Sequence, residues 1–118
     1  LSRRELVKIA EISEELLDQL EQYALITPRP GTGHYDTDAL VVAKTARELA
    51  DFGLEPRHLR AFKTAADREV GLVEQVVAPQ KAGRDTAARA RAEETVSEIA
   101  ALSVRLHATL VKIGLRSG

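Results

Sequence analysis

The sequence predicts a mainly α fold, in which a winged helix-turn-helix is followed by two long antiparallel helices. Of the 118 residues, 44% are hydrophobic but only 3% are aromatic. This composition favours helices packed on helices over sheets, whose strands prefer aromatic and β-branched side chains. Apolar residues also recur at helical spacing on both sides of one segment rich in proline and glycine. That segment is expected to form a short β-hairpin.

The first two helices are predicted over residues 3–10 and 13–22. Ser2 and Glu5 form a capping box at the first helix, and Ser13 is the N-cap of the second. The link Glu11-Ile12 is short enough to turn one helix sharply against the other. The pair therefore has the size and spacing of a helix-turn-helix, although many proteins that do not bind DNA contain such pairs.

The wing is predicted near residues 27–35. Residues 27–33 hold two prolines and two glycines, so they cannot be helical. The dipeptides Leu25-Ile26 and His34-Tyr35, on either side, are expected to pair as two very short strands. The sequence thus predicts a β-hairpin that follows the helix-turn-helix.

Two further helices follow the wing. A cap among residues 36–38 begins the third helix, which is expected to run to about Phe52 with Gly53 in a left-handed conformation. Pro56 suits the first position of the fourth helix, and Pro79 is expected to end it.

The last helix is predicted from Asp85 or Thr86 to about Ile113. Its apolar residues recur at spacings of 3 and 4, as in the a/d seam of a coiled coil, with Ser103 as the one polar member. A helix of roughly 28 residues is about 42 Å long, so it needs the fourth helix, a second copy of itself, or both as cover. The expected dimer interface consists of Val96, Ile99, Leu106, Leu110 and Ile113.

Charge divides the chain in the same place as these elements. Residues 1–55, the predicted winged helix-turn-helix, hold 6 Lys and Arg against 11 Asp and Glu. Residues 56–118, the predicted long-helix dimerisation region, hold 11 against 7. The two regions are expected to form one compact unit. An ordinary solvated surface explains so modest a difference, but acidic residues in the second helix are unfavourable beside phosphates.

The order of these pieces resembles the MerR family of transcriptional regulators. The resemblance covers roughly residues 2–65, and the stretch Ala65–Val70 is similar to the C-terminal domain of actinobacterial FtsR-type MerR proteins. The matching stretches are Ile12–Leu17, Tyr23–Arg29, Gly33–Leu40 and Leu49–Leu59.

The resemblance implies a dimeric, sequence-specific regulator whose partners are double-stranded DNA and a second copy. A preceding N-terminal winged-helix domain and RNA polymerase are further candidate partners, and a first residue other than Met agrees with a piece of a longer protein. The chain departs from the family's groove helix, because Asp18 stands where an Arg is usual and Gln19 where an aromatic is usual.

Candidate DNA contacts follow from this mapping. Glutamines of the second helix can bond to adenine edges, arginines of the first helix can bind phosphates, and a wing arginine can enter a minor groove. In the family the fourth helix begins near the DNA backbone. Each residue also has a plainer interpretation as solvated surface, and the tyrosine as a core side chain between the wing and the third helix. The candidates are Arg3, Arg4, Gln19, Gln22, Arg29, His34, Tyr35, Arg57 and His58.

Other classes of function find little support. There is no Cys, and the three histidines are dispersed, so neither a metal site nor a catalytic site is expected and no cofactor is implied. No apolar run approaches the about 18 residues of a membrane span. A cytoplasmic protein is expected. The alternative function is an effector-binding or protein-binding and dimerisation module that makes no DNA contact of its own.

Overall fold

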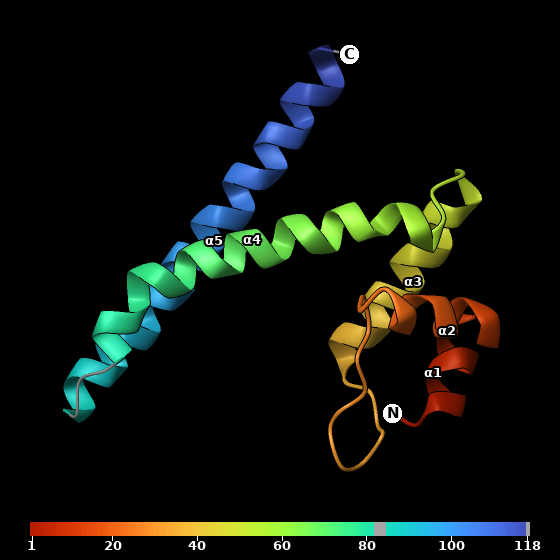
Figure 1. Ribbon diagram of the computed structural model, residues 1–118, viewed down its shortest axis with the longest axis horizontal. Coiled ribbons are helices and arrows are strands. Elements are labelled where there is room, and N and C mark those ends of the chain that lie inside the picture. Colours follow the sequence, from red (N-terminus) through yellow and green to blue (C-terminus); the bar gives the residue numbers. More distant parts are fainter. Residues whose placement is uncertain (82–84, 118) are drawn as a thin grey trace. The chain divides into compact units, whose positions relative to one another are not determined.

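The computed structural model describes residues 1–81 and 85–117, whose regular structure is helical (Figure 1). The chain divides into two compact units, Leu1–Ala65 and Ala66–Gly118. The helices are α1 (Arg3–Ala10), α2 (Glu14–Gln22), α3 (Thr37–Asp51), α4 (Pro56–Lys81) and α5 (Thr86–Ser117). The sequence predicted the boundary between the helix-turn-helix region and the long-helix region after residue 55.

The predicted helix starts are confirmed. Ser2 and Glu5 form the capping box of α1, and the hydroxyl of Ser13 accepts a hydrogen bond from the amide of Leu16 at α2. Asp36 caps α3 in the same way through the amide of Ala39. These caps stabilise amides that would otherwise lack a partner in the first turn.

No strand occurs among the described residues, so the prediction of a winged helix-turn-helix is wrong, whereas the mainly α class is confirmed. The two dipeptides that were expected to pair have other backbone partners. The amides of Leu25 and Ile26 both donate to the carbonyl of Leu20, at 2.9 and 3.3 Å, and so complete the end of α2. Tyr35 instead exchanges backbone hydrogen bonds with Leu1, at 2.6 and 2.8 Å.

The segment predicted as a wing is a closed loop. The amide of Arg29 donates to the carbonyl of His34 at 2.8 Å, and the amide of Gly33 donates to the carbonyl of Arg29 at 3.1 Å. Gly31 and Gly33 have φ values of 87° and 67°, which glycine adopts more readily than other residues. The loop therefore folds on itself without forming a ladder.

The core of the first unit lies between α1, α2 and α3. Leu6, Leu17 and Leu20 are fully buried there. The face that α3 presents to them is made of alanines, whose small side chains allow close approach between helices. The remaining buried members of this core are Ala10, Ile12, Ile26, Tyr35, Ala39, Ala43, Ala46 and Leu59.

The connection from α3 to α4 agrees with the sequence at both ends. Gly53 has a φ of 96°, the left-handed conformation predicted after the helix, and Pro56 is the first residue of α4. Pro79 does not end α4, which continues to Lys81. A proline in the last turn removes one hydrogen bond but does not prevent two further helical residues. The sequence also predicts a turn over residues 79–84, between this helix and the last one, and that turn lies in part outside the described residues.

The second unit is a pair of helices. Val77 of α4 and Ala92 of α5 are buried where the two helices pack. The part of α4 in this unit, Ala66–Lys81, is half as long as α5, which has 32 residues and continues past the predicted end to Ser117. The C-terminal part of α5 is therefore longer than the cover available within its own unit.

Candidate functional site

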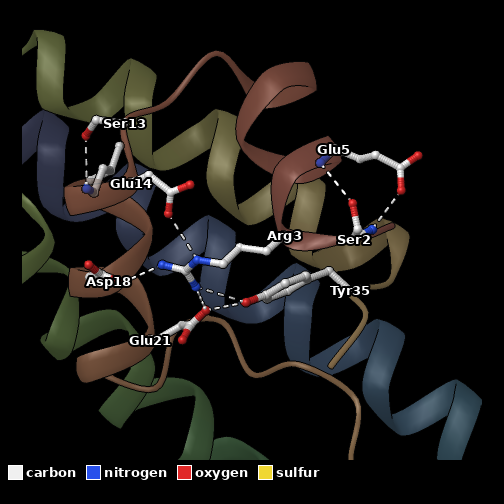
Figure 2. A network of polar contacts seen from close by, with 9 residues as sticks. Ser2, Arg3, Glu5, Ser13, Glu14, Asp18, Glu21 and Tyr35 are labelled. Atoms are coloured by element: carbon white, nitrogen blue, oxygen red, sulfur yellow. Dashed lines mark hydrogen bonds and ion pairs between the residues drawn. The ribbon is translucent and has the colours of Figure 1, made fainter. Parts of the chain in front are cut away.

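Arg3 is the centre of a polar network between α1 and α2 (Figure 2). Its Nε lies 3.1 Å from Oε2 of Glu14, its Nη1 lies 2.7 Å from Oε1 of Glu21, and its Nη2 contacts Asp18. Nη1 also donates to the hydroxyl of Tyr35 at 3.2 Å. The guanidinium that was a candidate for phosphate contact is thus directed at carboxylates of its own chain.

Burial alone acts to lower the pKa of Arg3. The hydrogen bonds to Tyr35 and Glu14 and the charge of Glu21 outweigh it, so the pKa is raised above its usual value. Three of the four carboxylates that made α2 unfavourable for DNA therefore face a permanent positive charge. The fourth, Glu15, is exposed.

Tyr35 is buried, with 4% of its surface exposed. Its hydroxyl donates to Glu21 and accepts from Arg3. Burial is the main cause that raises the pKa of Tyr35, and the hydrogen bond to Glu21 adds to it. Of the two interpretations of this tyrosine, the burial favours a core side chain over a DNA contact.

A groove of about 430 Å³ lies on another side of α2, and we call it the α2–α4 groove. It brings together Gln19 and Arg57, two candidate DNA contacts 38 positions apart in the sequence. Arg57 lies 3.3 Å from Glu55. The lining residues are Leu16, Gln19, Tyr23, Ala50, Glu55, Pro56 and Arg57.

Sequence reasoning missed one contact at this groove. The guanidinium carbon of Arg60 lies 5.4 Å from the ring centre of Tyr23, a cation–π arrangement. Arg60 follows Arg57 by three residues, so both side chains lie on one side of α4. That spacing was the available signal, but the position of Tyr23 beside them depends on the fold.

The remaining candidate DNA contacts are dispersed over the first unit. Arg4 is exposed on α1 and Gln22 on α2, whereas Arg29 and His34 are exposed at the closed loop. Nδ1 of His58 accepts a hydrogen bond from the amide of Glu55 at 3.0 Å, so this ring caps α4. None of these five residues is among those that line the α2–α4 groove.

The predicted dimer residues divide into two groups. Val96 and Ile99 are partly buried, whereas Leu106, Leu110 and Ile113 are exposed. Ile99, Leu106 and Leu110 line a groove of about 250 Å³ together with apolar residues of α4. We define the leucine face as Leu72 and Val76 of α4 with Leu102, Leu106, Leu110 and Ile113 of α5, all exposed.

One ion pair lies at this groove. Nδ1 of His107 is 2.6 Å from Oε1 of Glu69, so the pair links α5 to α4. The other residues of the groove are Leu72, Val73, Val76, Ile99, Ser103, Leu106 and Leu110. The surroundings of the pair are therefore almost wholly apolar.

Comparison with known proteins gives these surfaces a context. All of residues 1–118 match the family described as Rv1828-like, C-terminal domain. The chain belongs to this family. It is also 43% identical over 116 residues to the HTH-type transcriptional regulators Rv1828 of Mycobacterium tuberculosis and Mb1859 of Mycobacterium bovis, both named as uncharacterized. The match covers 98% of this chain and 47% of each regulator, so the chain spans about half their length.

Both relatives are named as transcriptional regulators, the class of protein that the sequence resemblance implied. The assignments to MerR and to the FtsR type stay predictions. In this Rv1828-like domain, the described residues contain no group of three or more His, Asp or Glu that could hold a metal ion. None of its described helices is long and apolar enough to cross a membrane.

Proposed function

We propose that this chain is the dimerising domain of an HTH-type transcriptional regulator and that its leucine face pairs with the same face of a second copy. The observation that carries the proposal is the exposure of large apolar side chains along one side of α5. Leu102, Leu106, Leu110 and Ile113 are 60%, 61%, 57% and 43% exposed. Full burial of an exposed side chain of this kind is favourable by about 1.5–3 kcal/mol of free energy.

Charge favours an antiparallel pair. Spacings of 4, 7, 7 and 4 put five charged residues on one side of α5, next to the leucine face. Within the described part of the chain, none of the five has an ion-pair partner. They are Glu94 and Glu98 in the first half and Arg105, Lys112 and Arg116 in the second.

These spacings are symmetric about Arg105. An antiparallel pair centred there puts Glu94 opposite Arg116 of the second copy and Glu98 opposite Lys112 of the second copy. A parallel two-fold pair would put the two copies of this row on opposite sides of the interface, where their charges could not pair with each other. The arrangement of charge thus supports the antiparallel orientation. In that pair, Arg105 of one copy lies next to Arg105 of the other copy, at the centre of the interface.

The oligomeric state tests the proposal. We expect a dimer for the unaltered chain in analytical ultracentrifugation and a monomer for Leu106→Glu. Val111→Glu is the matched control, because Val111 is also exposed but lies five residues away, on a different side of α5. An unaltered chain that stays monomeric at high concentration would overturn the proposal, and circular dichroism checks that both variants stay helical.

We propose DNA contact as a second function, at the α2–α4 groove. The supporting observation is the cluster of Gln19, Arg57 and Arg60, with Tyr23 beneath Arg60. Glutamine can bond to base edges and arginine can bind phosphate or guanine. In the alternative, a preceding N-terminal winged-helix domain makes every DNA contact and this chain supplies only dimerisation or protein binding.

A further inference from the structure

The second unit has another apolar surface, which we call the valine groove. It has a volume of about 380 Å³. Val104 belongs to it, whereas Leu102, two residues earlier, belongs to the leucine face, and residues two apart point to nearly opposite sides of a helix. The apolar lining residues are Ala66, Val70, Val73 and Val77 of α4 with Val96, Ala100 and Val104 of α5.

The valine groove has a buried floor and open edges. Val77 at the floor is buried, whereas Val70 and Val104 at the edges are exposed, Val104 by 67%. A second copy seated on the leucine face covers the other flank of the α4–α5 pair. The proposed dimer therefore leaves the valine groove without an occupant, and an exposed apolar groove of this kind is typical of an interaction site.

The charges of the described residues that line the groove are of one sign. The ionisable residues among them are Glu69 and Glu74, and none of them is cationic. Glu69 pairs with His107, whereas Glu74 is exposed at the α4 edge. Glu93 precedes Val104 by eleven residues, three turns of α5, so it lies on the same side of that helix. An occupant with positive charges beside its apolar contact complements this rim.

We propose that the valine groove binds an amphipathic α-helix of a partner protein, with an apolar stripe bordered by Lys or Arg. The lining is made of valines and alanines, which form a shallow groove that a helix can approach closely. Helices that dock in such grooves use apolar residues at positions i, i+3, i+4 and i+7. Lys or Arg residues beside that stripe would meet Glu74 and Glu93.

The test uses a labelled synthetic peptide of about 18 residues, five helical turns, with Leu in that pattern and Lys elsewhere. Controls are a peptide of the same composition in scrambled order and a peptide with Glu in place of Lys. Fluorescence anisotropy with the full chain measures binding. We expect the striped Lys peptide to bind at least about tenfold more tightly than either control.

Two matched pairs of substitutions locate the site. Val70→Gln with Val104→Gln should weaken peptide binding about tenfold, whereas Leu72→Gln with Leu106→Gln should leave it unchanged. Glu74→Gln, an exposed change that leaves the helix packing intact, should weaken binding several-fold at low salt only. Equal binding of scrambled and striped peptides, or equal loss in both pairs, would overturn the proposal.

The same variants separate this inference from the proposed dimer. Val70→Gln with Val104→Gln should leave the dimer intact in ultracentrifugation, whereas Leu72→Gln with Leu106→Gln should weaken it. A monomer from the valine variants would mean that a second copy occupies the valine groove, and the partner-helix proposal would then be rejected. If the unaltered chain is monomeric but still binds the striped peptide, the dimer proposal is rejected and the partner-helix proposal stands.

Discussion

Nη1 of Arg3 lies 2.7 Å from Oε1 of Glu21, and this ion pair joins the beginning of α1 to the end of α2. Asp18 and Glu14 contact the same guanidinium from one and two turns earlier on α2. The acidic side of α2 is therefore a set of partners for one arginine, and its charge has a structural cause. Arg3 in turn has few donors left for a phosphate.

Loss of the Arg3 side chain should destabilise the first unit. Arg3→Gln leaves Glu14, Asp18 and Glu21 to repel each other, and it removes a donor from the hydroxyl of Tyr35. Because two of the three carboxylates, Glu14 and Asp18, are largely exposed, we expect a loss of only about 1–2 kcal/mol in the free energy of unfolding. Urea denaturation followed by circular dichroism measures it. Arg4→Gln, an exposed neighbour on α1, is the control, and equal stability of the two variants would contradict the prediction.

Tyr35 should make stability fall at alkaline pH. Its pKa is raised above the ordinary value of 10.0, chiefly by burial, so the folded state favours the neutral phenol. The corresponding stability is present below about pH 10 and is lost as the pH rises through the higher pKa of the folded state. We expect the melting temperature of Tyr35→Phe to fall less steeply than that of wild type above about pH 10. Tyr23→Phe is the control, and the same slope in Tyr35→Phe and wild type would refute the assignment.

The charged row of α5 should determine which chains pair. Glu94→Lys with Glu98→Lys should weaken the homodimer, and so should Lys112→Glu with Arg116→Glu, because each creates like charges opposite each other. A mixture of the two variants should associate more tightly than either alone, since the charges again match. Sedimentation of each variant and of the mixture measures this. Glu93→Lys, outside the row, should pair like wild type, and a mixture no tighter than its components would exclude the antiparallel register.

DNA binding should depend on the α2–α4 groove. Arg57→Ala with Arg60→Ala should weaken binding of promoter-length duplex DNA by about tenfold or more, because each phosphate contact contributes a salt-dependent share. Fluorescence anisotropy at about 50 and 200 mM salt measures both the affinity and its salt dependence. Arg68→Ala, which removes an exposed arginine elsewhere on α4, is the control. No binding by the unaltered chain at the lower salt would leave the alternative, in which the chain makes no DNA contact.

Local signals were the part of the fold that the sequence could predict. The caps at Ser2, Ser13 and Asp36 and the turn at Gly53 each depend on a few neighbouring residues, and all agree with the structure. The predicted wing failed because backbone pairing depends on distant residues. Tyr35 pairs with Leu1, 34 positions away, and not with the nearer dipeptide.

The candidate binding surfaces also depend on contacts between residues that are distant in the sequence. The apolar spacing of α5 was visible in the sequence, but the share of that seam already packed against α4 was not. Gln19 and Arg57 could be chosen one by one, whereas their position around one groove with Tyr23 depends on three helices. The Arg3 network could not be predicted either, because it requires the relative placement of α1 and α2.

The symmetric row of charges on α5 also constrains what such a dimer can recognise. Two helices paired in opposite directions are related by a two-fold axis, so the dimer presents every surface of the chain twice. A DNA site contacted by both copies would then be an inverted repeat, with half-sites separated by the distance between the two contacting surfaces. A partner helix would likewise bind twice, once to each copy.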